Sequence, residues 1–176
     1  MGEPQVFDAA GLEFCCTLTP AQHMLDYNGH LNVAYYAVLF EDAARAIFAR
    51  LDLSQAYRER TDCALFAAEV HTVFLREVPA GASVSIYYRL LEASGSKIHG
   101  MFFMLRADDQ SLAATEEIMF LHVNLDRRRS APVPEPQAGR LAGLLARQRS
   151  LPEPPQRGRS VGQRRPDPGA PAVQKN

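Results

Sequence analysis

Residues 26–45 read DYNGHLNVAYYAVLFEDAAR, and this stretch decides both the fold and the candidate site. Its second half carries apolar residues at roughly helical spacing, which predicts one long helix over residues 33–51. Its first half is a polar turn that leads into that helix. The polar and turn-forming residues of the segment are Asp26, Asn28, Gly29, His30 and Asn32.

The junction between turn and helix has a chemical meaning. Asn32 is a favourable N-cap, so the amides of the first helical turn, beginning at Val33, have no partner inside the helix. Free N–H groups together with the helix dipole form a site for negative charge. Since Asp26 supplies a carboxylate a few residues upstream, one short segment can hold both a carboxylate and an oxyanion hole.

Each of these residues also has a purely structural interpretation. An aspartate next to an Asn-Gly turn often only bonds to its own backbone, and Asp26 fits that pattern. His30 either polarises a carbonyl and orients Asp26, or packs and hydrogen-bonds beneath the loop. Asn28 and Asn32 either position water or act only as turn and cap residues. Gly29 supplies a backbone shape that a side chain would obstruct.

The rest of the chain predicts an α+β fold. A short strand precedes the turn, and four strands joined by turns follow the helix, so an antiparallel sheet can hide one face under that helix. In the second of these four strands Val84, Ile86, Tyr88 and Leu90 alternate onto one face. The predicted strands are residues 12–18, 64–78, 83–92, 97–107 and 112–123, and residues 52–62 are a connection.

The motif also resembles a known family. The order Asp-x-x-Gly-His-x-Asn, then a tyrosine, then Glu and Arg inside the helix, resembles hot-dog-fold acyl-CoA thioesterases of the 4-hydroxybenzoyl-CoA thioesterase type. The segments DYNGH, EVHTVFLREVPAG and HGMFFMLRADDQSLAATEEIMFLHV are similar to betainyl-CoA thioesterases, which occur in bacteria alone or fused to carnitine dehydrogenases. The matching motif positions are Asp26, Gly29, His30, Asn32, Tyr35 or Tyr36, Glu41 and Arg45.

This resemblance implies a fold, an activity and an assembly. It implies a hot-dog fold, in which the sheet wraps one long central helix and two copies pair to build two sites at their interface. The implied assembly is a homodimer or a tetramer made of two dimers. The implied reaction is hydrolysis of an acyl-CoA without a cofactor. Asp26 would be the nucleophile or the general base, and an amide near Val33 would be the oxyanion donor.

Glu69 and His71 are a second pair of candidate residues. Two positions apart in a predicted strand, they share one face with Val73. A carboxylate and an imidazole on a largely apolar face suggest a substrate-binding site, and the resemblance places this strand beside the pocket. The alternative is a pair at the sheet edge that only faces water.

Aromatic residues around the turn suggest a chemical class for the acyl group. Tyr27, Tyr35, Tyr36 and Phe40 gather near Asp26 in the sequence. Aromatic faces attract quaternary ammonium groups, which would suit a cationic acyl group such as betainyl. Aromatic residues on a helix are also common in a protein core, and the chain lacks tryptophan, the best partner for a cation.

A change of composition at Asp126 predicts a domain boundary. Residues 1–126 hold 8 Lys/Arg and 17 Asp/Glu, whereas residues 127–176 hold 11 Lys/Arg, 3 Asp/Glu and nine of the twelve prolines. We therefore expect a thioesterase domain over residues 1–126 and a Pro/Arg-rich tail over 127–176. A short helix over 138–148 is expected inside this tail. The tail lacks interleaved aromatics and a recognition fold, so we expect no nucleic-acid partner.

Composition narrows the remaining possibilities. Three cysteines, two of them adjacent, do not suggest a disulfide framework, and a cytoplasmic protein is the simplest expectation. The chain contains no CxxC or HExxH motif, so the sequence does not predict a metal site. The chain contains no run of 18 apolar residues, so we expect no membrane-spanning helix. The first residues do not resemble a secretory signal. The alternative function is a non-catalytic hot-dog module that dimerises or binds an acyl ligand.

Overall fold

The computed structural model describes residues 6–159 and 161 of the chain. Its main elements are one antiparallel sheet, one long helix and two shorter helices, in the order expected for an α+β fold. The strands are β1 (Glu13–Leu18), β2 (Cys63–Phe74), β3 (Val84–Ser94), β4 (Lys97–Arg106), β5 (Leu112–Asn124) and β6 (Arg129–Ser130). The helices are α1 (Val33–Arg50), α2 (Gln55–Thr61) and α3 (Gln137–Gln148), with a 3-10 turn at Gln22–Met24.

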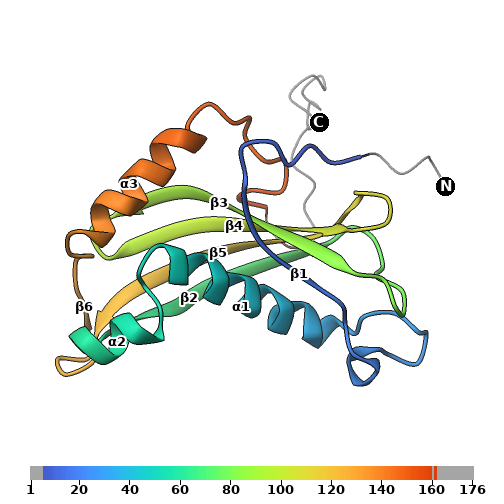
Figure 1. Cartoon of the computed structure of the whole chain (residues 1–176), viewed down its shortest axis with the longest axis horizontal. Helices are drawn as coiled ribbons and strands as arrows, with labels where there is room; N and C mark the ends of the chain where they lie inside the picture. Colours follow the sequence, from blue (N-terminus) through green and yellow to red (C-terminus); the bar gives the residue numbers. More distant parts are fainter. Residues whose placement is uncertain (1–5, 160, 162–176) are drawn as a thin grey trace, which may run out of the picture.

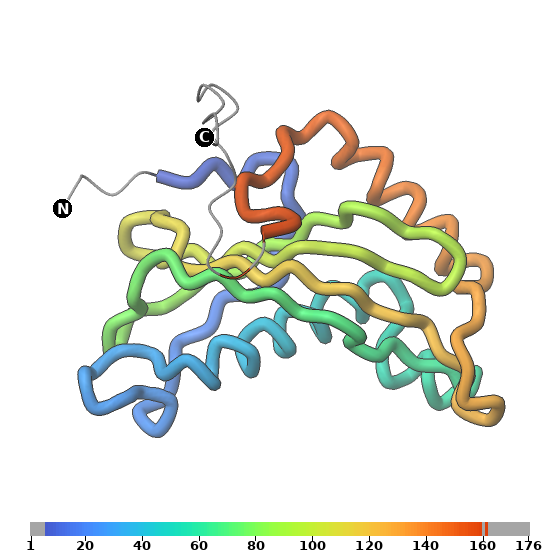
Figure 2. The backbone as a smooth tube through the Cα atoms, turned by 180° about the vertical axis from the view of Figure 1, so that it is seen from behind, coloured from blue at the N-terminus to red at the C-terminus, as the bar shows by residue number. Residues whose placement is uncertain are grey.

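The sheet wraps around α1, as the hot-dog expectation requires. The strand order is β1-β3-β4-β5-β2, and all pairs are antiparallel. Figure 1 shows α1 lying along one face of the curved sheet, and Figure 2 shows the same arrangement from behind. The predicted connection over residues 52–62 contains the short helix α2, which the sequence analysis missed.

Two alternating patterns meet to form the core. The alternation predicted for β3 is confirmed, because Val84, Ile86, Tyr88 and Leu90 are all at most 1% exposed. The helix α1 lays its apolar stripe against that face, and the ring of Phe48 lies 4.9 Å from the ring of Phe120 on β5. Burying such side chains is the main source of stability in a domain of this size. The other residues that α1 buries are Tyr36, Leu39, Phe40, Ala43, Ala44 and Ile47.

The strand β2 forms a free edge of the sheet. It pairs with β5 along its length, and no other described strand pairs with it. The two-residue strand β6 joins β5 at Val123 and Asn124, beyond Leu121, where the pairing of β5 with β4 ends. Because β6 takes the place of β4, the outer edge of β2 stays open for twelve residues.

The C-terminal segment packs on the same core as α1. The helix α3 begins one residue before the predicted 138–148 and ends where predicted. Its Leu141 and Leu144 belong to the main buried cluster and are 2% and 1% exposed. Its Gln148 accepts a hydrogen bond from the amide of Leu90 (2.8 Å) and donates to the carbonyl of Tyr88 (3.2 Å). The pairing of β1 with β3 ends at Tyr88. Beyond that point the side chain of Gln148 forms the hydrogen bonds that a neighbouring strand would otherwise form with the edge of β3. The composition change at residue 126 is therefore not a break in packing.

Deleting residues 130–176 is expected to lower the melting temperature, because it uncovers the edge of β3 and the core beneath α3. In the full chain, Leu144→Ala should cost about 2–5 kcal/mol of unfolding free energy, the usual cost of emptying a buried leucine site. The matched control is Leu145→Ala one residue further, which is only half-buried and should cost less. Thermal and urea unfolding followed by circular dichroism measures all three. A deletion variant with an unchanged melt would show that residues 1–129 fold by themselves.

Candidate active site

A cavity of about 410 Å³ lies where the start of α1 meets the end of β2. Three of the residues that the sequence analysis selected for catalysis, Asp26, His30 and Val33, line it. The structure therefore brings together a carboxylate, an imidazole and the first residue of the helix. The remaining lining residues are Leu31, Tyr36, Phe74, Leu75, Arg76 and Glu77.

The turn holds the carboxylate of Asp26 in place through backbone amides. One carboxylate oxygen, Oδ1, accepts from the amides of Asn28 (2.8 Å) and His30 (3.2 Å), and Oδ2 accepts from the side-chain amide of Asn28 (3.4 Å). Gly29 has φ +79°, a conformation that side chains rarely adopt. An added Cβ would meet no atom within 4 Å, so the backbone angle and not crowding requires glycine. Asp26 is thus a turn residue that also faces a cavity.

These hydrogen bonds determine the charge of Asp26. Partial desolvation raises the pKa of the carboxyl, but the bonds from the amides of His30 and Asn28 outweigh it and bring the pKa below its usual value. Hydrogen bonds to the charged form favour that form. Asp26 is therefore ionised at neutral pH, as both a nucleophile and a general base must be.

The helix start matches the prediction made for Asn32. Its side-chain oxygen accepts from the amide of Ala34 at 3.0 Å, which is N-cap geometry. The amide of Tyr35 donates to the carbonyl of Asn32 at 2.9 Å. The amide of Val33 has no hydrogen-bond partner among the described residues. A free amide in the first helical turn can donate a hydrogen bond to a developing oxyanion.

His30 ties the turn to the strand end. Its Nδ1 lies 3.3 Å from a carboxylate oxygen of Glu77, and its backbone forms an isolated bridge with Pro79. The next amide, that of Leu31, donates to the carbonyl of Val78 at 2.8 Å. The imidazole is thus oriented by Glu77, a residue that the sequence analysis did not select.

Only one of the tyrosines near the turn forms a wall of the cavity. Tyr36 packs edge-on against Phe74 with ring centroids 4.9 Å apart, and both line the cavity. Tyr27 is 97% exposed, and Tyr35 packs edge-on against His23. The aromatic surface beside Asp26 therefore comes from one helix residue and one strand residue.

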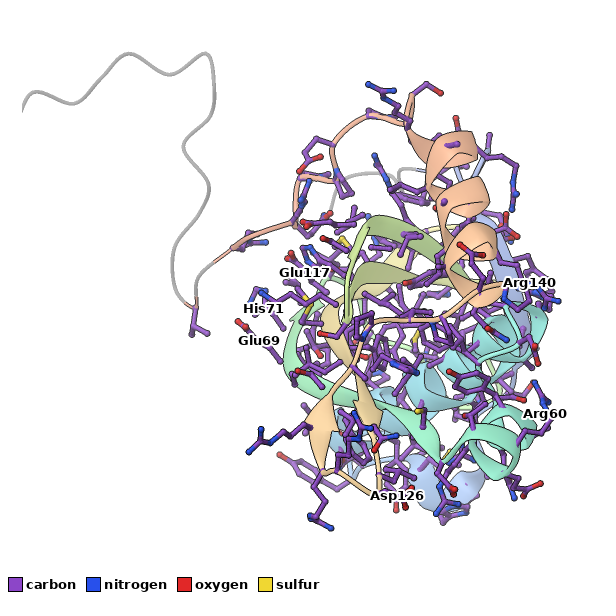
Figure 3. The ribbon with its side chains drawn as sticks, turned by 90° about the vertical axis from the view of Figure 1, so that its left-hand side faces the viewer. Arg60, Glu69, His71, Glu117, Asp126 and Arg140 are labelled. Carbon is purple, nitrogen blue, oxygen red and sulfur yellow. The ribbon has the colours of Figure 1, made fainter. Side chains whose placement is uncertain are left out.

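Glu69 and His71 lie on the face of the sheet opposite to α1. They pair with Met119 and Glu117 of β5, which share that outer face. Figure 3 shows Glu69, His71 and Glu117 gathered at one side of the sheet. Glu117 there also contacts His99 at 2.8 Å. Within one chain, the structure does not bring Glu69 or His71 to the cavity that holds Asp26.

One charged residue on the α1-facing side was missed. Glu116 is 5% exposed and pairs with Phe102 and Thr72; Thr72 donates to its Oε2 at 3.2 Å. Burial raises the pKa of Glu116 to about 7, the hydroxyl of Thr72 lowers it, and the nearby charge of Glu41 raises it further. The sequence did hold a signal, because this glutamate interrupts the alternation of Ala114, Ile118 and Phe120 on the core-facing side.

Glu116→Gln is expected to stabilise the fold at about pH 8 and not at about pH 4. Near pH 4 the carboxyl is largely protonated in both states. As pH rises, the unfolded chain loses this proton from about 4.5, whereas the folded chain keeps it until about 7, so wild-type stability falls. The loss is about 3 kcal/mol, since each unit of pKa difference corresponds to about 1.4 kcal/mol. Melting temperatures of both proteins across this pH range test it, and parallel curves would contradict a raised pKa.

Other chemistries find little support in the described part of the chain. Burial raises the pKa of the Cys15 thiol to about 12, so this cysteine is not an activated nucleophile. No cluster of three metal-ligating side chains occurs within residues 6–159. No helix among the described residues has the length and apolar character needed to span a membrane.

Comparisons with known proteins identify the family of the chain. The sequence model of the thioesterase-like superfamily matches residues 20–141. A betainyl-CoA thioesterase of Pseudomonas aeruginosa is 37% identical over 139 residues, which cover 78% of this chain and 87% of that protein. An L-carnitine dehydrogenase/betainyl-CoA thioesterase of Rhizobium meliloti is 30% identical over 80% of this chain, and the match spans 28% of that longer protein.

A solved structure extends the likeness to three dimensions. A Staphylococcus aureus protein in complex with CoA superposes with a TM-score of 0.81 at 25% identity. The superposition covers 92% of this chain and 99% of that one. The similarity therefore includes the wrapped sheet, its central helix and a large part of the C-terminal segment.

Proposed function

Because the chain belongs to the thioesterase-like superfamily and is an acyl-CoA thioesterase, we propose that it acts on betainyl-CoA, with Asp26 as the catalytic carboxylate. The observation that carries the catalytic assignment is that Asp26, which is ionised, and Val33, whose amide has no partner among the described residues, line one cavity. A thioester carbonyl bound between them would have a base or nucleophile on one side and an oxyanion donor on the other.

Two reaction courses are consistent with this arrangement. As a general base, Asp26 takes a proton from a water molecule, whose oxygen attacks the thioester carbonyl. As a nucleophile, Asp26 attacks that carbonyl itself and forms a mixed anhydride, which water then hydrolyses. In both courses the amide of Val33 donates to the carbonyl oxygen as it becomes negative. Breaking the C–S bond releases CoA as a thiolate that takes up a proton.

The other residues of the turn have supporting roles in this proposal. Asn28 donates two hydrogen bonds to Asp26, Asn32 caps the helix that presents Val33, and His30 is held by Glu77. His30 orients the turn and lies within the cavity that receives the thioester. The proposal therefore assigns direct contact with the reacting group to Asp26, His30 and Val33.

The acyl group is proposed from the relatives and from the cavity wall. The P. aeruginosa relative is named a betainyl-CoA thioesterase. Tyr36 and Phe74 give the cavity an aromatic wall, and the face of an aromatic ring attracts a quaternary ammonium group. A small cationic acyl group therefore suits the cavity better than a long apolar chain.

Asp26→Asn is expected to lower kcat at least about a hundredfold while the fold stays intact, because the amide can neither attack the carbonyl nor accept a proton from water. Release of the CoA thiol from betainyl-CoA, followed with a thiol reagent, measures the loss, and circular dichroism checks the fold. The matched control is Asp126→Asn, an exposed aspartate outside the cavity. Near-normal turnover by a folded Asp26→Asn protein would remove the assignment.

We also propose that two copies pair along β2. The open edge carries Phe66, Val70 and Phe74, each about half exposed. Such an edge is prone to pair with another strand. Phe74 and the following Leu75 line the cavity, so a partner at this edge would border the site.

Three free cysteines further suit a reducing, cytoplasmic compartment.

Phe66→Lys is expected to shift the protein from dimer toward monomer, because a lysine at an edge strand opposes edge-to-edge pairing. Phe14→Lys on β1 is the matched control, since the two phenylalanines are 51% and 48% exposed at opposite edges of the sheet. Light scattering coupled to size exclusion gives the masses. Dissociation by Phe14→Lys alone would place the interface at the other edge.

A further inference from the structure

We propose that Glu116 determines the specificity of the enzyme for a cationic acyl group, because its negative charge acts through the cavity wall on the quaternary ammonium head. This inference rests on the proposed function and deepens it, because it names the residue that would recognise the charge. Glu69, the carboxylate predicted from sequence for this role, lies on the other face of the sheet.

Contacts place the Glu116 side chain on the face that α1 covers. Directly paired residues of an antiparallel sheet share a face, and Glu116 is paired with Phe102 on β4. The ring of Phe102 packs against Phe40 of α1, with centroids 6.1 Å apart. On the other side Glu116 is paired with Thr72 of β2. The carboxylate therefore points between α1 and the inner side of the edge strand.

The same face of the sheet continues to the cavity wall. Phe74 is two residues beyond Thr72 on β2, and its ring packs against Tyr36 in the cavity wall. Two residues of a strand span about 7 Å. Asp26, Tyr36 and Phe74 line the cavity, and Glu116 lies on the same face beside Thr72 without lining it. The ammonium group would then lie on the Phe74 side of the cavity, where the negative charge of Glu116 acts on it through the wall.

The carboxylate of Glu116 lacks a balancing cation. None of the ion pairs among the described residues includes it, and its one hydrogen bond comes from the neutral hydroxyl of Thr72. The charged neighbour that acts on it is another carboxylate, Glu41 of α1. Burying an unpaired carboxylate is costly. A substrate cation would supply the missing charge.

The chemistry of the ligand fits this surrounding. A trimethylammonium group has no N–H to donate, so a protein recognises it by charge and by aromatic faces. Thr72 fixes one oxygen of Glu116, and the aromatic pair of Tyr36 and Phe74 belongs to the cavity wall. A neutral acyl group of the same shape would fill the same space and leave the carboxylate unpaired.

The test compares two substrates of equal shape. Betainyl-CoA carries a trimethylammonium group, and 3,3-dimethylbutanoyl-CoA replaces its nitrogen with carbon. We expect Glu116→Gln to lower kcat/KM for betainyl-CoA at least about tenfold more than kcat/KM for the neutral analogue, since a charge interaction in a partly desolvated site is of at least this size. Equal effects on both substrates would overturn the inference.

The matched control is Glu117→Gln, the next residue of β5 on the opposite face of the sheet. It should leave the ratio of the two kcat/KM values unchanged, and a ratio that falls as much as in Glu116→Gln would also overturn the inference. Failure of the proposed function would look different. In that case the wild-type enzyme would hydrolyse neither substrate, or Asp26→Asn would hydrolyse both normally.

The pH dependence of the same ratio is a second readout. Glu41 from α1 is the charged group that faces Glu116, while β2 and β4 present Thr72 and Phe102. Because the pKa of Glu116 lies at about 7, the preference for betainyl-CoA should rise between about pH 6 and pH 8, as the carboxylate forms. Taking the ratio cancels titrations that affect both substrates. A ratio that is flat in wild type, or that rises equally in Glu116→Gln, would contradict the assignment.

Discussion

The site depends on one backbone connection between the turn and the sheet. The amide of Leu31 donates to the carbonyl of Val78 at 2.8 Å, which fixes the segment before α1 against the chain that follows β2. The ring contact of Tyr36 with Phe74 strengthens the same junction from the side-chain level. Because this junction joins the turn to the end of β2, Asp26 and the start of the helix line one cavity. Catalysis by positioned groups requires such fixed geometry.

The two long edges of the sheet are treated differently, and the difference has a functional meaning. The edge of β3 that extends beyond β1 is covered by Gln148, whose side-chain amide replaces a neighbouring strand. The edge of β2 has no such cover among the described residues. It ends in Phe74, a residue of the cavity wall. The uncovered edge is therefore the one beside the cavity, where a second copy would border the proposed site.

Stability and specificity oppose each other at Glu116. Glu116 is 5% exposed and forms no ion pair with another described residue. Burial raises the pKa of its carboxyl, which weakens the fold above neutrality. A glutamine would fill the same volume and accept the same hydrogen bond from Thr72. The charge thus brings no structural benefit that an amide would lack. Binding of a cationic substrate would account for the charge of Glu116, because groups that destabilise a fold are often found at functional sites.

The sequence by itself determined the long helix, the five long strands, the N-cap at Asn32 and the turn that carries Asp26, because these depend on residues close together in the chain. The periodicity of α1 and the alternation of β3 were likewise predictable. Only the tertiary structure decided which face of β2 turns toward the helix. The register and the bulge between Ala67 and Glu69 set that choice, since one residue of shift exchanges the two faces. For this reason Glu69 and His71 lie outside the cavity, while Glu116, distant in sequence from the turn, lies on the face that continues to the cavity wall.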